Sequence, residues 1–295
     1  MNSDWRSEPR TWLAIVTALL LWASAFAGIR AGLEGGYGPG EVALLRFGTA
    51  SVALAGYALV TRMRLPDRRD LAVIALAGFL GISVYHVALN YGERTVTSGA
   101  AALLISSSPI FTSMLSSRFL GERISVKGWV GVIVSFFGVA LIAFGEGGGV
   151  TLNTDALLIL IAAVATSLYF IVSKPPLRRY SGLEFTSYAI WAGTIPMLVF
   201  APTLVSQFAD AQPSATLAII YLGIFPGAIA YVLWSHALSR MPASSLSTFL
   251  YAQPVNAALI AWIWLGEIPA LLTMIGGAIS IGGVVLVNTK GKTRD

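Results

Sequence analysis

Residues 99–122 read GAAALLISSSPIFTSMLSSRFLGE, and residues 244–267 read SSLSTFLYAQPVNAALIAWIWLGE. Both stretches are apolar, contain small residues before a proline, and end on Gly-Glu. The two prolines, Pro109 and Pro254, lie 145 residues apart, and so do the two Gly-Glu pairs. This match predicts that the chain is built from two copies of one structural unit.

Two further matches extend the repeat toward the start of each copy. Residues 71–85 resemble residues 217–231 at an offset of 146, and each segment ends on a tyrosine. More weakly, residues 22–26 resemble residues 166–170. We therefore expect two domains, with boundaries at residues 1–147 and residues 148–295.

The composition places these units in a membrane. Of the 295 residues, 56% are apolar and 11% are charged, against about 25% charged residues in soluble domains. Such segments must be helical, because lipid offers no partner to an unpaired backbone group. A helix crosses the bilayer in about 20 residues, and ten apolar runs of this size occur: 11–33, 40–61, 70–92, 97–119, 126–145, 153–173, 183–203, 216–236, 243–264 and 270–288.

The basic residues predict how these ten helices are oriented. Sixteen of the 19 Lys and Arg residues fall on the side that holds both termini, and two fall on the other side. Because basic residues concentrate in cytoplasmic loops, both termini are expected in the cytoplasm. Each copy has five helices, an odd number, so the second copy enters from the opposite side. The expected fold is an all-α integral membrane protein of two inverted five-helix repeats, in a bacterial cytoplasmic (inner) membrane.

Several classes of function are disfavoured by the residues present. The chain has no cysteine and two histidines, which leaves little for a metal site. It has no phosphate-binding loop of the P-loop type. The interface carries no evident cluster of carboxylates or histidines for an enzyme, and the net charge of +5 comes from short loops and not from a nucleic-acid-binding surface. We expect neither a cofactor nor a nucleic-acid partner. Inverted repeats are typical of secondary transporters, whose substrate binds near the midplane between the halves, and argue against a passive channel.

The motifs resemble those of the EamA-like family of the drug/metabolite transporter superfamily, nearest to its bacterial aromatic amino-acid exporters. They are Trp22-Ala-Ser-Ala-Phe26, Leu45-Arg46-Phe47, and the proline with terminal Gly-Glu that closes each copy. The resemblance covers nearly the whole chain. It implies ten helices and export of amino acids, including aromatic ones, or of other small metabolites. One departure is Gln253, since family members often carry Glu before the second proline.

The candidate substrate-binding residues are polar, aromatic or helix-breaking side chains within the predicted spans. Small and polar residues at spacings of three or four share one helix face, and aromatic walls can stack on a ring or hold an ammonium group. Arg46 is a candidate contact for a substrate carboxylate. The other candidates are Trp22, Phe26, Tyr85, His86, Ser106, Pro109, Tyr169, Tyr231, Ser244, Ser247, Tyr251, Gln253 and Pro254.

Structural roles compete with each of these assignments. Small faces also serve close helix packing, and His86 can be a hydrogen-bonded core residue. Arg46 can pair with Glu41 or extend toward the membrane surface. The carbonyls freed by the prolines can bind substrate, or they can be satisfied by nearby serines such as Ser107 or Ser108.

The acidic residues bear on energy coupling. All 14 Asp and Glu residues fall in loops or within about a turn of a predicted span end, which favours facilitated export by alternating access without tight ion coupling. The alternatives are a proton-coupled exporter and a transporter of nucleotide sugars or phosphate esters. The latter calls for several basic residues in the cavity, whereas Arg46 alone lies inside a predicted span. The expected partners are a small-molecule substrate and the lipid bilayer; the sequence leaves the oligomeric state open, and a monomer is compatible with it.

Overall fold

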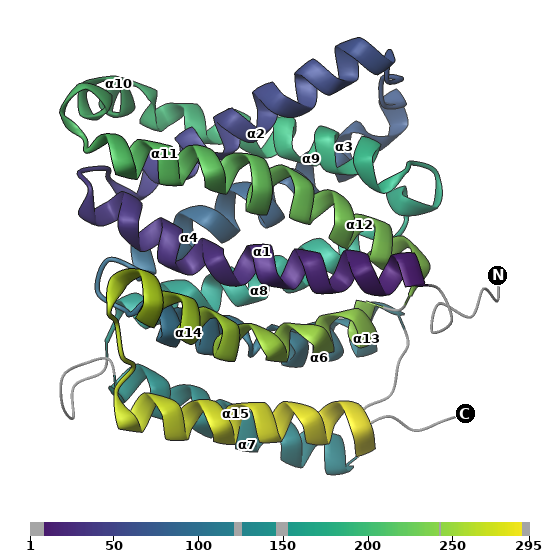
Figure 1. The fold of residues 1–295 in the computed structure, drawn as a ribbon. Coiled ribbons are helices and arrows are strands. Elements are labelled where there is room, and N and C mark those ends of the chain that lie inside the picture. The colour runs from purple at the N-terminus through teal and green to yellow at the C-terminus, as the bar shows by residue number, and fades with distance from the viewer. Residues whose placement is uncertain (1–8, 121–125, 146–152, 242, 291–295) are drawn as a thin grey trace.

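A computed structural model describes residues 9–120, 126–145, 153–241 and 243–290 (Figure 1). All regular secondary structure within these ranges is helical. The first half contains α1 (Pro9–Glu34), α2 (Pro39–Thr61), the short 3-10 helix η2 (Arg68–Asp70), α3 (Leu71–Gly78), the π-helix η3 (Phe79–Val84), α4 (Tyr85–Gly92), α5 (Ser98–Ile105), α6 (Ser108–Leu120) and α7 (Val126–Gly145).

The second half follows a similar order, with additional short helices. It contains α8 (Asp155–Ser173), η4 (Pro176–Arg178), α9 (Gly182–Met197), η5 (Leu198–Phe200), α10 (Ala201–Asp210), α11 (Pro213–Leu222), the π-helix η6 (Gly223–Ile229), α12 (Ala230–Arg240), α13 (Ala243–Ser247), the 3-10 helix η7 (Thr248–Ala252), α14 (Gln253–Leu265) and α15 (Leu271–Lys290). A π-helix thus interrupts the corresponding helix in each half.

The helices have the length and surface of membrane spans. Seven helical segments in the described residues are long and apolar enough to cross a bilayer, and three shorter apolar helices accompany them. Large apolar side chains such as Leu59, Phe137 and Ile263 are exposed on the outside, where lipid is their solvent. The start of α1 and the end of α15 lie at the same end of the molecule (Figure 1). The chain is a multi-pass membrane protein.

Contacts between helices occur in pairs that follow the repeat. Helix α1 of the first half packs against α12 and α14 of the second half. Its counterpart α8, in the second half, packs against α4 and α6 of the first half. Helices α4 and α6 are the counterparts of α12 and α14. Likewise η3 packs against α9, and η6 packs against α2. Each of these helices packs against helices of the other half, so the two copies interlock.

The two repeated prolines lie where the helices are interrupted. Proline lacks the N–H that would bond the carbonyl four residues earlier, and for Pro109 this carbonyl belongs to Ile105. The hydroxyl of Ser108 donates to it at 2.5 Å. The carbonyl freed by Pro254 belongs to Leu250, and it accepts a hydrogen bond from Ser106 of the other half at 3.4 Å. The serine alternative from the sequence is therefore confirmed at Pro109.

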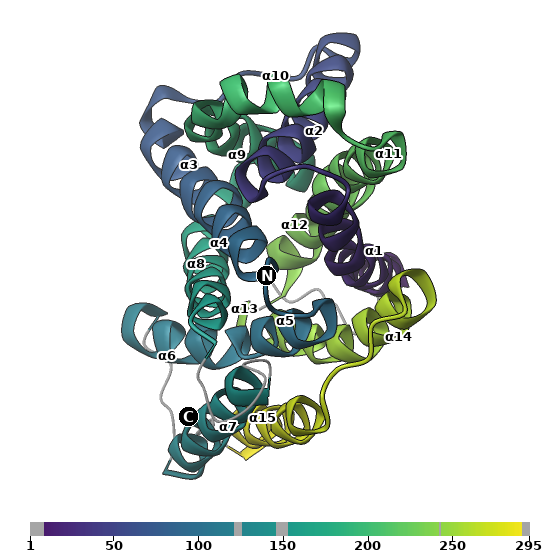
Figure 2. The ribbon, with the colours of Figure 1, turned by 90° about the vertical axis from the view of Figure 1, so that its left-hand side faces the viewer.

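Helices α7 and α15 form a pair at one edge of the molecule (Figures 1 and 2). The hydroxyls of Ser135 and Ser280, which are separated by the repeat offset, lie 3.0 Å apart. Glycines let the two backbones approach closely, as small residues do in membrane helix pairs. A Cβ on Gly283 would lie 2.5 Å from the backbone nitrogen of Ser135, whereas one on Gly282 would meet nothing within 4 Å.

These adjacent glycines provide a test of the α7–α15 interface. We expect Gly283→Ala to destabilise the protein by roughly 1–3 kcal/mol, because the new methyl group collides with backbone that cannot move aside. The matched variant Gly282→Ala should be neutral or slightly stabilising, since alanine is the better helix former. Thermal unfolding in detergent measures both. Equal melting temperatures for the two variants would contradict this packing.

Candidate functional site

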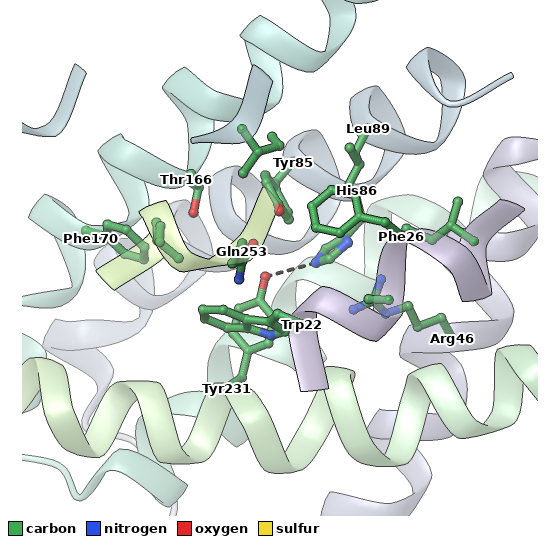
Figure 3. Close-up of a pocket in the computed structure, with 14 residues that line it drawn as sticks. Trp22, Phe26, Arg46, Tyr85, His86, Leu89, Thr166, Phe170, Tyr231 and Gln253 are labelled. Atoms are coloured by element: carbon green, nitrogen blue, oxygen red, sulfur yellow. Dashed lines mark hydrogen bonds between the residues drawn. The ribbon is translucent and has the colours of Figure 1, made fainter. Parts of the chain in front are cut away.

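A cavity lies at the centre of the molecule, where the two apolar core clusters meet (Figure 3). Its water-accessible volume is about 30 Å³, room for two or three water molecules. The cavity is lined by Trp22, Ala25, Phe26, Ile29, Arg46, Tyr85, His86, Leu89, Ile105, Thr166, Phe170, Tyr231, Leu250 and Gln253.

Many lining residues are repeat partners of one another. Phe26 faces the cavity from α1 and Phe170 from α8, and the same holds for Trp22 with Thr166. Tyr85 and Tyr231 both begin or nearly begin the helix that follows a π-helix. Ile105 and Leu250, at the repeat offset, complete the set. The cavity is therefore lined by equivalent residues of both copies.

The π-helices help to position the aromatic wall. The indole N–H of Trp22 donates to the carbonyl of Pro226, inside η6, at 3.0 Å. The Trp22 ring meets Tyr231 edge to face, with centroids 5.2 Å apart. Edge-to-face contact is a favourable arrangement for aromatic rings. Trp22 is thus fixed at one end by backbone and at the other by the tyrosine it helps to orient.

Tyr231 links the two halves through hydrogen bonds. Its hydroxyl donates to the carbonyl of Gly81, within η3, at 3.1 Å, and lies 2.9 Å from Nε2 of His86. A hydroxyl has one proton to donate, so His86 donates through Nε2–H. Its Nδ1 is then an acceptor, and this atom is buried without a hydrogen-bond partner. In this tautomer of the neutral ring, Nδ1 offers a lone pair beside the cavity.

Arg46 is a charged side chain that is buried in the wall of the cavity. Its side chain is 1% exposed, and no hydrogen bond or ion pair joins it to any other described residue; Nε is buried and unpartnered. Its guanidinium lies 5.2 Å from the Phe47 ring centroid. The predicted alternative partner, Glu41, accepts a hydrogen bond from Thr203 instead. A buried guanidinium without a carboxylate partner is costly.

The predicted site residues, Arg46 included, fall into three groups. Seven line the cavity: Trp22, Phe26, Arg46, Tyr85, His86, Tyr231 and Gln253. Five are outside its lining. Ser106 bonds the carbonyls of Ala102 and Leu250, Pro109, Ser247 and Pro254 are buried, and Tyr169 packs behind Tyr231 with centroids 6.2 Å apart. The side chains of Ser244 and Tyr251 lie outside the described residues.

Two residues that line the cavity could have been predicted from the repeat but are not among the predicted site residues. Thr166 and Phe170 are the repeat partners of Trp22 and Phe26, which are in that set. Tyr169, the predicted neighbour of Phe170, points elsewhere. A Cβ on Gly81 would lie 2.4 Å from the Tyr169 ring, so this tyrosine fills the space above a glycine in the neighbouring helix and not the cavity.

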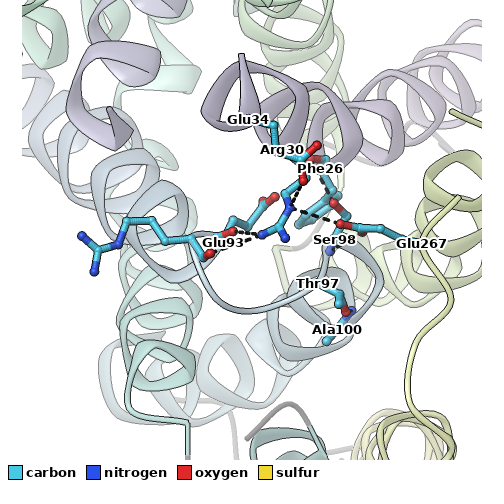
Figure 4. Close-up of polar contacts among 9 residues, drawn as sticks. Phe26, Arg30, Glu34, Glu93, Thr97, Ser98, Ala100 and Glu267 are labelled. Atoms are coloured by element: carbon cyan, nitrogen blue, oxygen red, sulfur yellow. Dashed lines mark hydrogen bonds and ion pairs between the residues drawn. The ribbon is translucent and has the colours of Figure 1, made fainter. Parts of the chain in front are cut away.

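A cluster of charges lies beyond the cavity, toward the ends of α1, α4 and α14 (Figure 4). Arg30 donates to the backbone carbonyl of Glu93 at 2.8 Å and forms ion pairs with Glu34 at 2.8 Å and Glu267 at 3.2 Å. Glu267, of the second repeat, also accepts from the backbone N–H of Ser98 at 3.0 Å. The cluster therefore ties the two copies together at this end. Across the described residues, no three His, Asp or Glu side chains are grouped as metal ligands.

Comparison with known proteins gives the family of this architecture. The model of the EamA-like transporter family matches residues 10–144 and again residues 154–289. An uncharacterized transporter of Bacillus subtilis, YdfC, is 46% identical over 92% of this chain and 88% of its own length. A probable terminal-alkyne amino-acid exporter of Streptantibioticus cattleyicolor is 44% identical, over 96% of this chain and 95% of its own.

The fold has also been seen in a solved structure. A crystal structure with 21% sequence identity aligns with a TM-score of 0.65 and covers 95% of this chain and 96% of the other. The family and the similar proteins are transporters, not enzymes. Two family matches along one membrane-embedded chain, together with relatives that share nearly half its residues, show that the chain is a transporter that belongs to the EamA-like family.

Proposed function

We propose that this transporter exports amino acids with uncharged side chains, and that Arg46 binds their carboxylate. The observation that carries the proposal is the buried guanidinium in the central cavity, which has no protein partner among the described residues. A carboxylate is the group that a guanidinium binds best, by paired hydrogen bonds. Binding it would remove the electrostatic cost of leaving Arg46 unpaired.

The remaining groups of the site suit the rest of an amino acid. The unpartnered Nδ1 of His86 can accept a hydrogen bond from an ammonium group. The faces of Phe26 and Tyr85 can attract the same cation. The mostly apolar lining suits an uncharged side chain, in keeping with the relative whose name is probable terminal-alkyne amino-acid exporter.

The charge count opposes the alternative of phosphate-bearing substrates. A nucleotide sugar carries two phosphate charges and would need several cations. Arg46 is the one basic side chain among the described residues that line the cavity. We infer that the substrate carries a single carboxylate, and that its aromatic or aliphatic side chain contacts the aromatic wall.

The mechanism we propose is alternating access in a ten-helix, inverted-repeat arrangement within the cytoplasmic membrane, both termini facing the cytoplasm. Two observations support it. Helices of each half pack against helices of the other half, and the start of α1 lies at the same end of the molecule as the end of α15. The breaks at the repeated prolines and the two π-helices supply points where helices can bend. The substrate's own gradient drives net export.

Counterflow into liposomes with purified protein tests the substrate class. L-propargylglycine, a terminal-alkyne amino acid, is the main probe, because azide coupling to the alkyne measures its accumulation. We expect exchange of this probe and of L-phenylalanine, and no exchange of a nucleotide sugar. Exchange of the nucleotide sugar without exchange of either amino acid would overturn the proposal.

A further inference from the structure

Glu93 is a buried carboxyl group that transport of an amino acid does not by itself explain. It follows the last residue of α4, at a predicted span end, yet its side chain is 0% exposed. Both carboxyl oxygens are buried without a hydrogen-bond partner. Arg30, the nearest cation of the outer cluster, bonds the backbone carbonyl of Glu93 and directs its ion pairs to Glu34 and Glu267.

Charges from several helices act on this carboxyl group. Burial raises the pKa of Glu93 well above its ordinary range, and the negative charge of Glu267 raises it further. The guanidinium groups of Arg30 and Arg46 act in the opposite direction. The charged and titratable groups around Glu93 are Arg30 and Glu34 on α1, Arg46 on α2, Tyr85 on α4, Arg94 next to it in the chain, Asp155 at the start of α8, which pairs with Arg94, and Glu267 after α14.

We propose that Glu93 is a proton-binding site linked to the anion site at Arg46, so that a proton and a substrate carboxylate bind together. This inference rests on the proposed function, because it takes Arg46 as the carboxylate anchor. Arg46 faces the cavity, and its charge acts on Glu93. Glu93 lies one helical turn after Leu89, which lines the same cavity, and its backbone N–H donates to the Leu89 carbonyl at 2.9 Å. The carbonyl of Glu93 accepts a hydrogen bond from Arg30 of the outer charge cluster, so Glu93 connects this cluster to the wall of the substrate site.

The direction of the linkage follows from the charges. When Glu93 is neutral, Arg46 carries an uncompensated positive charge and binds a carboxylate tightly. When Glu93 is ionised, its negative charge compensates Arg46 and repels the incoming carboxylate. Substrate affinity therefore falls as the pH rises through the pKa of Glu93, and by reciprocity substrate binding takes up a proton in that range. A pH difference across the membrane would then modulate the export that the substrate gradient drives.

Binding of L-propargylglycine measured against pH tests the linkage. The range is kept between the carboxyl and amino titrations of the probe itself. We expect the wild-type affinity to fall roughly tenfold across the Glu93 titration. In Glu93→Gln, the neutral isostere, the affinity should stay at the wild-type low-pH value over the whole range, and proton uptake on binding should disappear. An unchanged pH dependence in Glu93→Gln would overturn the proposal.

Two control variants separate Glu93 from its neighbours. Glu34→Gln removes an exposed carboxylate of the same cluster and should keep the wild-type pH dependence. His86→Asn tests the other titratable group of the site, because a protonated His86 would also favour a carboxylate at low pH. We expect His86→Asn to retain the tenfold change. If the tenfold change were lost in His86→Asn and retained in Glu93→Gln, the proton would bind His86 and the proposal for Glu93 would be wrong.

A measurement without substrate distinguishes failure of the proton site from failure of the proposed function. Infrared spectra of wild type minus Glu93→Gln should contain the C=O band of a protonated carboxyl group at neutral pH. Absence of this band would refute the proton site even if Arg46 binds substrate. If the band is present and the probe does not bind wild-type protein at any pH, the proposed substrate class fails and with it the linkage.

Discussion

Replacement of Arg46 by methionine is expected to abolish amino-acid transport, by about a hundredfold or more, while the protein stays as stable as wild type or becomes more stable. Loss of a buried charge partner costs a bound carboxylate several kcal/mol. The free protein, by contrast, is relieved of a buried guanidinium that has no partner among the described residues. A purely structural arginine would give the opposite result for stability.

The measurements are counterflow of L-propargylglycine in liposomes and thermal unfolding in detergent. Arg46→Lys is the conservative control, and we expect it to keep part of the activity, because lysine supplies the charge without the paired geometry. A large fall in the melting temperature of Arg46→Met, with proportional loss of folded protein, would show that Arg46 supports the fold and does not act on substrate.

The second large effect is expected at Arg30. Arg30→Gln removes the ion pair to Glu267, which joins the two repeats at this end of the cavity, and the bond to the Glu93 carbonyl within the first repeat. The population with this end open should rise about tenfold for each 1.4 kcal/mol lost. The chain has no cysteine, so a single Leu89→Cys in the cavity lining reports this opening through reaction with an impermeant thiol reagent added outside.

The control keeps the cluster and removes one exposed charge. Glu34 is 58% exposed in its pair with Arg30, and exposed pairs contribute little. Glu34→Gln in the Leu89→Cys background should therefore label at nearly the unmodified rate. Equal labelling of Leu89→Cys with and without Arg30→Gln would mean that this cluster does not close the cavity.

Much of the fold is predictable because lipid restricts the backbone to helices. The apolar runs therefore locate the helices, and the paired Pro109 and Pro254 reveal the repeat from residue order alone. The interruptions within the helices are harder to predict from the sequence. A π-helix at Phe79–Val84 leaves no periodic mark in an apolar run, and the use of Ser106 to bond a carbonyl of the other half depends on a contact between residues 144 apart.

Site residues can be predicted where a polar or aromatic side chain stands in an apolar run or at a repeated position. They cannot be predicted where tertiary contacts alone bury them. Arg46 and Gln253 stand out as polar residues in apolar runs, and both line the cavity. Glu93 has the sequence context of a loop residue, at the end of a span. Its side chain is nevertheless 0% exposed. Its backbone carbonyl accepts a hydrogen bond from Arg30, which in turn pairs with Glu267, and no local sequence pattern predicts contacts between residues so distant in the chain.

The most direct measurement is a cycle that removes the carboxylate from the substrate and the guanidinium from the protein. L-propargylglycine and its decarboxylated amine are compared in binding to wild type and to Arg46→Gln. We predict that wild type prefers the acid by about a hundredfold and that this preference disappears in Arg46→Gln, which corresponds to a coupling of roughly 2.7 kcal/mol. Equal preference for the acid in both proteins would show that Arg46 does not bind the carboxylate.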